Sequence, residues 1–168
     1  MATQKVLTNN AGTITEVIPN TASSGTGDAG KLVALNSAGQ VDITMMPTGI
    51  GPDTATINAS EALSAGAFVN VWNSTGAAVR NADATTVGKE TNGFVLAGVL
   101  SGAPALVYFS GINNQVSGQT PGPVFLTTTP GVAGGAPPSG SGNVVQRLGI
   151  ATSATSITFE PSAPIVLA

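Results

Sequence analysis

The sequence predicts an all-β protein: an antiparallel β-sandwich or barrel of jelly-roll-like type, preceded by an extended N-terminal arm with a small hairpin. Three observations favour this fold class. Short apolar runs alternate with clusters of turn residues, as in strands joined by tight turns. The 22 glycines and 11 prolines recur too often for a 3.6-residue apolar period to persist. Aromatic residues make up only 4% of the chain, so valine, leucine and isoleucine must supply most of the core.

Residues 58–168 are expected to form the β domain. Apolar runs bounded by turn residues predict strands at 67–72, 77–80, 94–100, 105–109, 124–126, 144–151 and 156–159. The run at 94–100 is apolar on both faces, which is typical of a central strand. Alternation within 144–151 places four side chains on one face, namely those of Val144, Gln146, Leu148 and Ile150. Only 59–63 has the character of a helical turn.

Residues 1–57 are expected to form the N-terminal arm. Apolar positions are sparse up to Pro19, and a flexible stretch rich in Ser, Thr and Gly follows at 20–27. A strand at 32–35, a turn at 36–39 and a return strand at 41–43 predict the small hairpin. Gly49, Gly51 and Pro52 are typical of a linker to the β domain.

The composition argues against an enzyme. The chain has no histidine and no cysteine, and only 8% of its residues are charged. Histidine is the commonest general acid, base and metal ligand, and cysteine is the most reactive side-chain nucleophile. We therefore expect no catalytic residue, no metal ligand and no cofactor-binding residue, and we expect a structural or binding protein instead.

Charge and hydropathy exclude further classes of protein. The net charge is −3, and the basic residues are scattered at Lys5, Lys31, Arg80, Lys89 and Arg147. Nucleic-acid binding needs a concentrated positive field, so no nucleic acid is expected as a partner. No apolar run reaches membrane-spanning length, so no membrane is expected either. The first five residues lack the apolar core of a signal peptide, which predicts a protein made in the cytoplasm.

Two overlapping glycine motifs occur at residues 25–31. Gly25 to Gly30 fits GxGxxG, and with Lys31 the segment fits most of a phosphate-binding P-loop. Both motifs need a helix to begin directly after the glycines. Here Leu32 stands where a P-loop has Ser or Thr, and a strand is expected to follow. We therefore interpret the match as a consequence of the high glycine content.

The acidic residues are a second set of candidates. Calcium binding would need a loop that concentrates several of the four dispersed aspartates, Asp28, Asp42, Asp53 and Asp83. Solvated turn residues are the preferred interpretation. Glu61 and Glu90 could form the carboxylate pair of a glycosidase, but nothing in the sequence positions them together.

The remaining candidates are weaker. No serine has a histidine to activate it, and the glycosylation sequons at Asn58 and Asn73 mean little without a signal peptide. Trp72 is expected to be a core or interface anchor. The apolar tail 164–168 should form a covered strand, since an exposed apolar edge promotes aggregation. It could pair within its own sheet or with a neighbouring subunit, and the neighbour is the preferred alternative.

Two segments resemble virion proteins of tailed bacteriophages. The stretch from Asp28 to Asp42 reads DAGKLVALNSAGQVD and ends in Met45-Met46-Pro47, with Met46 at the usual leucine position. It is similar to a module near the start of phage fibre and head-decoration proteins. The stretches 125–131, 136–151 and 157–162 resemble the C-terminal β domain of the same proteins.

The resemblance implies a phage capsid decoration (cement) protein, with a head- or tail-fibre component for attachment or receptor binding as the alternative. It further implies a β-rich homotrimer on the capsid surface of the virion, with the major capsid protein as partner. Residues 58–168 would then be the trimerisation domain and residues 1–57 the capsid attachment arm. A small hydrolase is a third class, for which the sequence offers no catalytic group.

Overall fold

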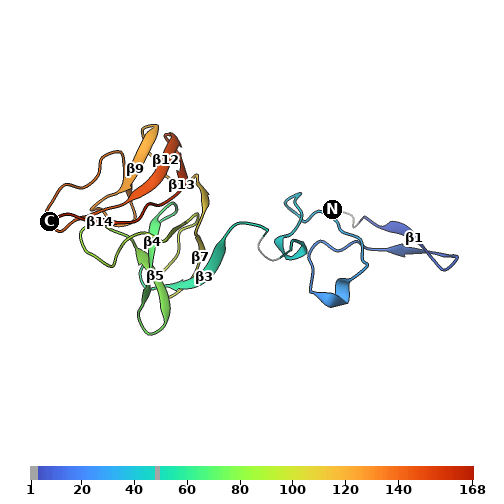
Figure 1. Cartoon of the computed structure of the whole chain (residues 1–168). Coiled ribbons are helices and arrows are strands. Elements are labelled where there is room, and N and C mark those ends of the chain that lie inside the picture. The colour runs from blue at the N-terminus through green and yellow to red at the C-terminus, as the bar shows by residue number, and fades with distance from the viewer. Residues whose placement is uncertain (1–3, 48–49) are drawn as a thin grey trace. The chain divides into compact units, whose positions relative to one another are not determined.

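The computed structural model describes residues 4–47 and 50–168 and is nearly all β, with 39% of its residues in strands and 4% in helices. The predicted all-β fold class is therefore confirmed. The chain divides into two compact units, Met1–Gly51 and Pro52–Ala168 (Figure 1). The boundary expected between residues 57 and 58 falls inside strand β3 (Thr54–Ala59), which belongs to the second unit. Residues 1–3 at the N-terminus and Gly49 of the expected linker lie outside the described residues.

The first unit contains a hairpin that the sequence did not predict. Strands β1 (Val6–Asn10) and β2 (Thr13–Val17) pair antiparallel, and Ala11 and Gly12 between them both have positive φ, at 50° and 91°. Two positive φ values in a two-residue loop define the turn that best matches the twist of a hairpin. Two single 3₁₀ turns follow, η1 (Thr26–Asp28) and η2 (Ile43–Met45).

The hairpin expected at 32–35 and 41–43 is wrong. Val33 forms an isolated parallel bridge with Asn20, and η2 begins where the return strand should end. The turn at 36–39 is present, because the Gly39 N–H donates to the Asn36 carbonyl at 2.9 Å. The Asp42 carboxylate caps η2 by accepting from the Thr44 N–H at 3.0 Å, which ends any return strand there.

Five strands of the second unit form a closed barrel in the order β3 (Thr54–Ala59), β5 (Ala77–Asn81), β4 (Phe68–Asn73), β6 (Gly93–Val95) and β7 (Pro104–Tyr108). Strand β7 pairs back onto β3, and only the β3–β5 pair is parallel. Small side chains fill the interior, since a five-stranded barrel is narrow. They are Ala59, Leu63, Ala67, Val69, Val79, Val95, Ala105 and Val107.

A five-stranded antiparallel sheet makes up most of the remainder. Its order is β10 (Ala133–Gly134), β9 (Gly122–Leu126), β12 (Arg147–Ser153), β13 (Ser156–Phe159) and β8 (Gly111–Asn113). The short strand β11 (Val144–Val145) pairs separately with β14 (Ile165–Val166). The C-terminal tail thus pairs within its own chain, although Ile165 and Val166 stay 64% and 52% exposed.

An aromatic cluster joins the barrel to the sheet. Phe68 from β4 and Phe94 from β6 point out of the barrel, and Phe159 from β13 meets them with ring centroids 5.8 and 5.5 Å away. All three rings are at most 2% exposed, and Tyr108 stacks on Phe94 at 5.4 Å. Such pairs contribute about 0.5–1.5 kcal/mol each beyond the area that they bury.

The buried side-chain amide of Gln146 adds a polar contact to the apolar packing of the aromatic cluster. The Thr91 N–H donates to Oε1 of Gln146 at 2.8 Å, and Nε2 of Gln146 donates to the Thr91 carbonyl at 3.1 Å. Both residues are buried. The side chain of Gln146 therefore pairs with the backbone of Thr91 as a neighbouring strand would, and it satisfies two buried polar groups at once.

Most of the strands expected in the second unit are present, namely those at 67–72, 77–80, 105–109, 124–126 and 156–159. The strand expected at 94–100 is wrong beyond Val95, where β6 ends. Leu100 is 78% exposed, so this end of the segment is not central either. The expected helical turn at 59–63 is also wrong. Ala59 ends β3, and Leu63 forms an antiparallel bridge with Val99, so both side chains enter the barrel interior instead.

Gly149 marks a β-bulge in β12. The predicted alternation holds for Val144, Gln146 and Leu148, which are buried, and fails at Ile150, which is 44% exposed. The pairing of β12 with β9 shifts register between Arg147 and Gly149, so the next inward side chain comes from Ala151. Gly149 has φ 144°, and a Cβ there would collide with the Thr158 carbonyl oxygen.

We expect Gly149→Ala to lower the free energy of unfolding by about 2–4 kcal/mol, because the added methyl both strains the backbone and strikes β13. Gly135→Ala is the matched control, since its Cβ would meet nothing within 4 Å and its φ is not positive. Urea denaturation of both variants measures the difference. Equal stability of the two variants would contradict the importance of the bulge.

Candidate functional site

The first unit has no core of its own. None of its described residues, 4–47 and 50–51, is buried. Eleven large apolar side chains in these ranges are 41% to 68% exposed, and together they are called the N-terminal apolar surface. They are Val6, Leu7, Ile14, Ile18, Leu32, Val33, Leu35, Val41, Ile43, Met46 and Ile50. Large exposed apolar patches are typical of sites that contact other macromolecules, so this surface is a candidate site.

The hairpin displays apolar side chains on both faces. Leu7 and Ile14 lie diagonally on one face and are 68% and 62% exposed, and Val6 faces Val17 on the other. The hairpin is held by backbone pairing and by an exposed ion pair of Lys5 with Glu16 at 2.7 Å. A two-stranded hairpin with no buried face is marginally stable in water.

The loop 28–47 uses its polar residues to fix its backbone. The Asn36 side-chain carbonyl accepts from the N–H groups of Ala38 and Gln40 at 2.9 and 3.1 Å. The Asp42 carboxylate accepts from the Thr44 hydroxyl and N–H, which lowers the pKa of Asp42. Since the polar groups are satisfied locally, the apolar side chains of the loop remain at the surface.

The glycine motif at 25–31 lies in this unit and lacks the helix that a phosphate site needs. Residues 26–28 make a single 3₁₀ turn, so no helix begins after the glycines. The Asp28 carboxylate accepts from the Lys31 ammonium at 2.7 Å and from the Ser24 N–H at 2.6 Å, and these bonds lower the pKa of Asp28. The Lys31 ammonium and the Ser24 N–H, which a phosphate would need as donors, therefore already bond to Asp28.

An open groove of about 990 Å³ runs between the base of the hairpin and this loop. Its lining residues are Gln4, Lys5, Val6, Ile18, Pro19, Thr21, Ala22, Ala34, Leu35, Asn36, Ser37, Gly39 and Asp42. Val6, Ile18 and Leu35 are its large apolar side chains. The groove is therefore the part of the N-terminal apolar surface best shaped to accept side chains of a partner.

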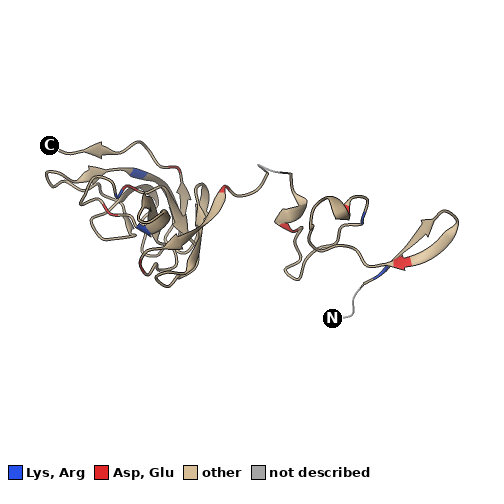
Figure 2. Cartoon of the chain, turned by 90° about the horizontal axis from the view of Figure 1, so that it is seen from below, with Lys and Arg blue, Asp and Glu red and all other residues tan. Residues whose placement is uncertain are grey.

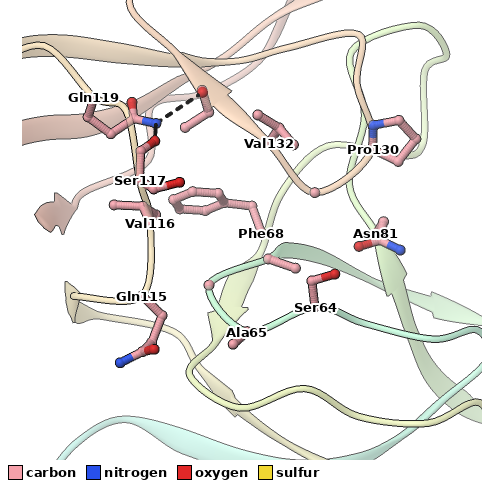
Figure 3. Close-up of a pocket in the computed structure, with 14 residues that line it drawn as sticks. Ser64, Ala65, Phe68, Asn81, Gln115, Val116, Ser117, Gln119, Pro130 and Val132 are labelled. Atoms are coloured by element: carbon pink, nitrogen blue, oxygen red, sulfur yellow. Dashed lines mark hydrogen bonds between the residues drawn. The ribbon is translucent and has the colours of Figure 1, made fainter. Parts of the chain in front are cut away.

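The second unit has a smaller cavity of about 190 Å³ beside Phe68 (Figure 3). Gln119 closes one side of it by donating to the carbonyls of Ser117 and Ala133 at 3.2 and 3.4 Å. The lining contains no charged residue and no base that could activate Ser64 or Ser117. The cavity is also smaller than the roughly 300 Å³ at which ligand pockets begin.

Glu61 and Glu90 each accept a hydrogen bond from a backbone N–H. Glu61 accepts from the N–H of Asn81 at 2.7 Å, and Glu90 accepts from the N–H of Gly88 at 3.0 Å. Asp53 is exposed. No group of three or more acidic residues within 4–47 and 50–168 could hold a metal ion. Neither the calcium nor the glycosidase alternative gains support from this geometry.

Asp83 is the one buried aspartate in the described part of the chain, at 4% exposed. Its carboxylate accepts from the hydroxyl and N–H of Thr85 and from the Lys89 ammonium at 3.0 Å. Burial raises the pKa of Asp83, but the bonds from Thr85 and Lys89 outweigh burial, and the pKa is lowered overall. The ion pair closes the loop between β5 and β6.

Trp72 is not a core residue. It is half-buried, its indole N–H donates to the Ser60 hydroxyl at 3.1 Å, and the Arg80 guanidinium lies 4.5 Å from its ring centroid. Asn58 lies within β3, and Asn73 accepts from the Gly76 N–H in the predicted turn.

Comparisons with models of protein families, with curated proteins and with solved structures found no match. In the described ranges no helix has the length and apolar character to cross a membrane. Figure 2 shows charged residues of both signs distributed over both units. The N-terminal apolar surface is therefore the most distinctive candidate site of the chain.

We expect Asp83→Asn to lower the free energy of unfolding by about 1–2 kcal/mol at neutral pH, because it removes the charge-assisted bonds. The folded-state pKa of Asp83 is lowered, so its contribution is present above the unfolded value of about 3.9 and is lost as the pH falls through the folded-state pKa.

The stability difference between the wild-type protein and Asp83→Asn should therefore shrink below about pH 4. Urea denaturation at several pH values measures it, with the exposed Asp53→Asn as control. A difference that stays constant down to about pH 2 would contradict this role of the ion pair.

Proposed function

We propose that this chain is a non-enzymatic structural protein of a phage virion, a capsid decoration (cement) protein that binds the outer surface of the head as a homotrimer. The observation that carries the proposal is the N-terminal apolar surface: a unit whose described residues include none that is buried is joined to a well-packed β unit. The similarity of residues 28–47 to the virion module supports the same function.

The energetics favour a unit that is completed by a partner. Ordering the backbone costs roughly 1–2 kcal/mol per residue, and no residue in 4–47 or 50–51 is fully buried to offset that cost. Burying one large aliphatic side chain contributes about 1.5–3 kcal/mol. Docking several of the eleven exposed side chains onto the major capsid protein would therefore offset part of that cost.

The two units suit a division of tasks. The second unit holds its own core, so it provides a stable body that can be shared by three copies. Each copy in a trimer contributes one N-terminal unit, and the three attachments reinforce one another through effective concentration. Scarcity of charge helps, because docking then desolvates few ions. The mechanical result would be a clamp across neighbouring capsomers.

A head- or tail-fibre component remains the alternative, since the module at 28–47 is similar to that of fibre proteins as well. Receptor binders for sugars present open aromatic faces. In this chain Phe68, Phe94 and Phe159 are buried, and Arg80 covers the Trp72 ring. These observations favour decoration. Copy number separates the two, because decoration requires many copies over the whole shell.

Removing residues 1–51 should leave a folded second unit that binds shells at least about tenfold more weakly, since the apolar surface is gone and the core is intact. Co-sedimentation with shells stripped of this protein measures binding, and thermal unfolding reports on the remaining fold. Shell binding that is unchanged by the truncation would sink the proposed attachment role.

Single charges in the hairpin test the surface more finely. Leu7→Asp and Ile14→Asp should each weaken shell binding by about tenfold, because each places a charge in an apolar contact. Thr13→Asp is the matched control, since it adds the same charge to the hairpin at an exposed polar position on the other face. An equal loss for all three variants would indicate a general charge effect and not an apolar contact.

A further inference from the structure

The outer face of the five-stranded sheet carries an apolar row. In the register of the sheet, Ile150 on β12 lies between Pro123 on β9 and Thr158 on β13, and Thr158 lies opposite Ile112 on β8. The row therefore crosses four strands. Ile150 and Ile112 are 44% and 59% exposed, while the inward residues on the same strands are buried.

The bulge at Gly149 is what places Ile150 in this row. Without the register shift, the alternation that buries Gln146 and Leu148 would bury Ile150 as well. The structure instead buries the smaller Ala151 and turns the isoleucine to solvent. A conformation that demands glycine is thus used to move a large apolar side chain outwards, which has no benefit for the isolated unit.

Two opposite charges lie at one end of the same face. Arg147 is the next outward residue before Ile150 on β12, and Glu160 directly follows β13, with its N–H donating to the Leu148 carbonyl. Neither side chain forms an ion pair with any residue in 4–47 or 50–168. Arg147 lies on β12 and Glu160 follows the neighbouring strand β13, so the two charges are displaced from each other across the sheet.

We propose that this face is the contact surface between copies of the chain in the homo-oligomer. The outer faces point toward the symmetry axis, Ile112 and Ile150 pack against the faces of neighbouring copies, and Arg147 of one copy pairs with Glu160 of the next. The sideways offset suits a ring, in which every copy gives its arginine to one neighbour and its glutamate to the other. The inference deepens the proposed homotrimer, but it does not depend on the capsid.

Size-exclusion chromatography with light scattering on the full chain tests this surface. The wild-type protein should run as an oligomer, and Ile150→Asp and Ile112→Asp should each raise its dissociation constant at least about tenfold. Val87→Asp is the matched control, because Val87 is 60% exposed outside the sheet. Thermal unfolding confirms that each variant is folded, which we expect since both isoleucines are exposed in the single chain.

Charge exchange identifies the partner as a second copy, and it remains informative if an aspartate variant fails to fold. Arg147→Glu and Glu160→Arg should each weaken the oligomer several-fold, and the double exchange should restore it. The shell-binding variant Leu7→Asp should leave the oligomer unchanged. If Leu7→Asp dissociates it and Ile150→Asp does not, the N-terminal unit forms the contact and the inference is overturned.

The inference is also overturned if both isoleucine variants keep the wild-type mass, or if the wild-type protein is monomeric up to about 100 μM. A monomeric wild-type protein would also overturn the proposed homotrimer, whereas the isoleucine variants test this contact surface alone. An oligomer that ignores Ile150→Asp but binds shells through the N-terminal apolar surface would leave the attachment role intact.

Discussion

Packing of Phe68 and Phe94 from the barrel against Phe159 from the sheet is the interaction on which the second unit depends. The barrel interior holds mainly alanine and valine, which bury little area per residue. An aromatic ring buries roughly 150–250 Å². Three rings gathered at one junction therefore compensate for a chain that is poor in large side chains. The barrel and the sheet form a single unit because this junction is shared between them.

Polar side chains complete the unit where regular pairing ends. Gln146 pairs with the Thr91 backbone, Asn113 donates to the Gly66 carbonyl at 2.9 Å, and Asp83 closes its loop with Lys89. Each of these connects segments that no strand ladder joins. Chains with short strands have many such ends, and buried groups left unpaired there would cost more than the bonds contribute. Hydrogen bonds from neutral side chains such as Gln146 and Asn113 thus stabilise the unit although it has few charged residues.

The two units differ in whether their apolar side chains are buried or exposed, and the proposed function rests on this difference. One unit buries its apolar side chains and is complete, whereas the other fixes its backbone with polar side chains and leaves its apolar ones at the surface. Under the proposed function, the complete unit is the body of a capsid-bound oligomer and the coreless unit is its attachment to the shell. Under the same proposal the protein has only to adhere, and adhesion requires neither histidine nor cysteine.

The sequence alone determined the all-β class, the turns and most of the strands of the second unit, because these depend on glycine, proline and asparagine at local positions and on short apolar runs. The sequence also predicted that no helix follows the glycines at 25–31, and a single 3₁₀ turn lies there. Tertiary structure decided the rest. The hairpin formed at 6–17 and not at 32–43, Ala59 and Leu63 entered the barrel interior instead of forming a helical turn, and Ile150 turned outwards at Gly149. In the last two cases the outcome depends on which distant strand supplies the partner, and a one-residue change of register moves a side chain from the core to the surface.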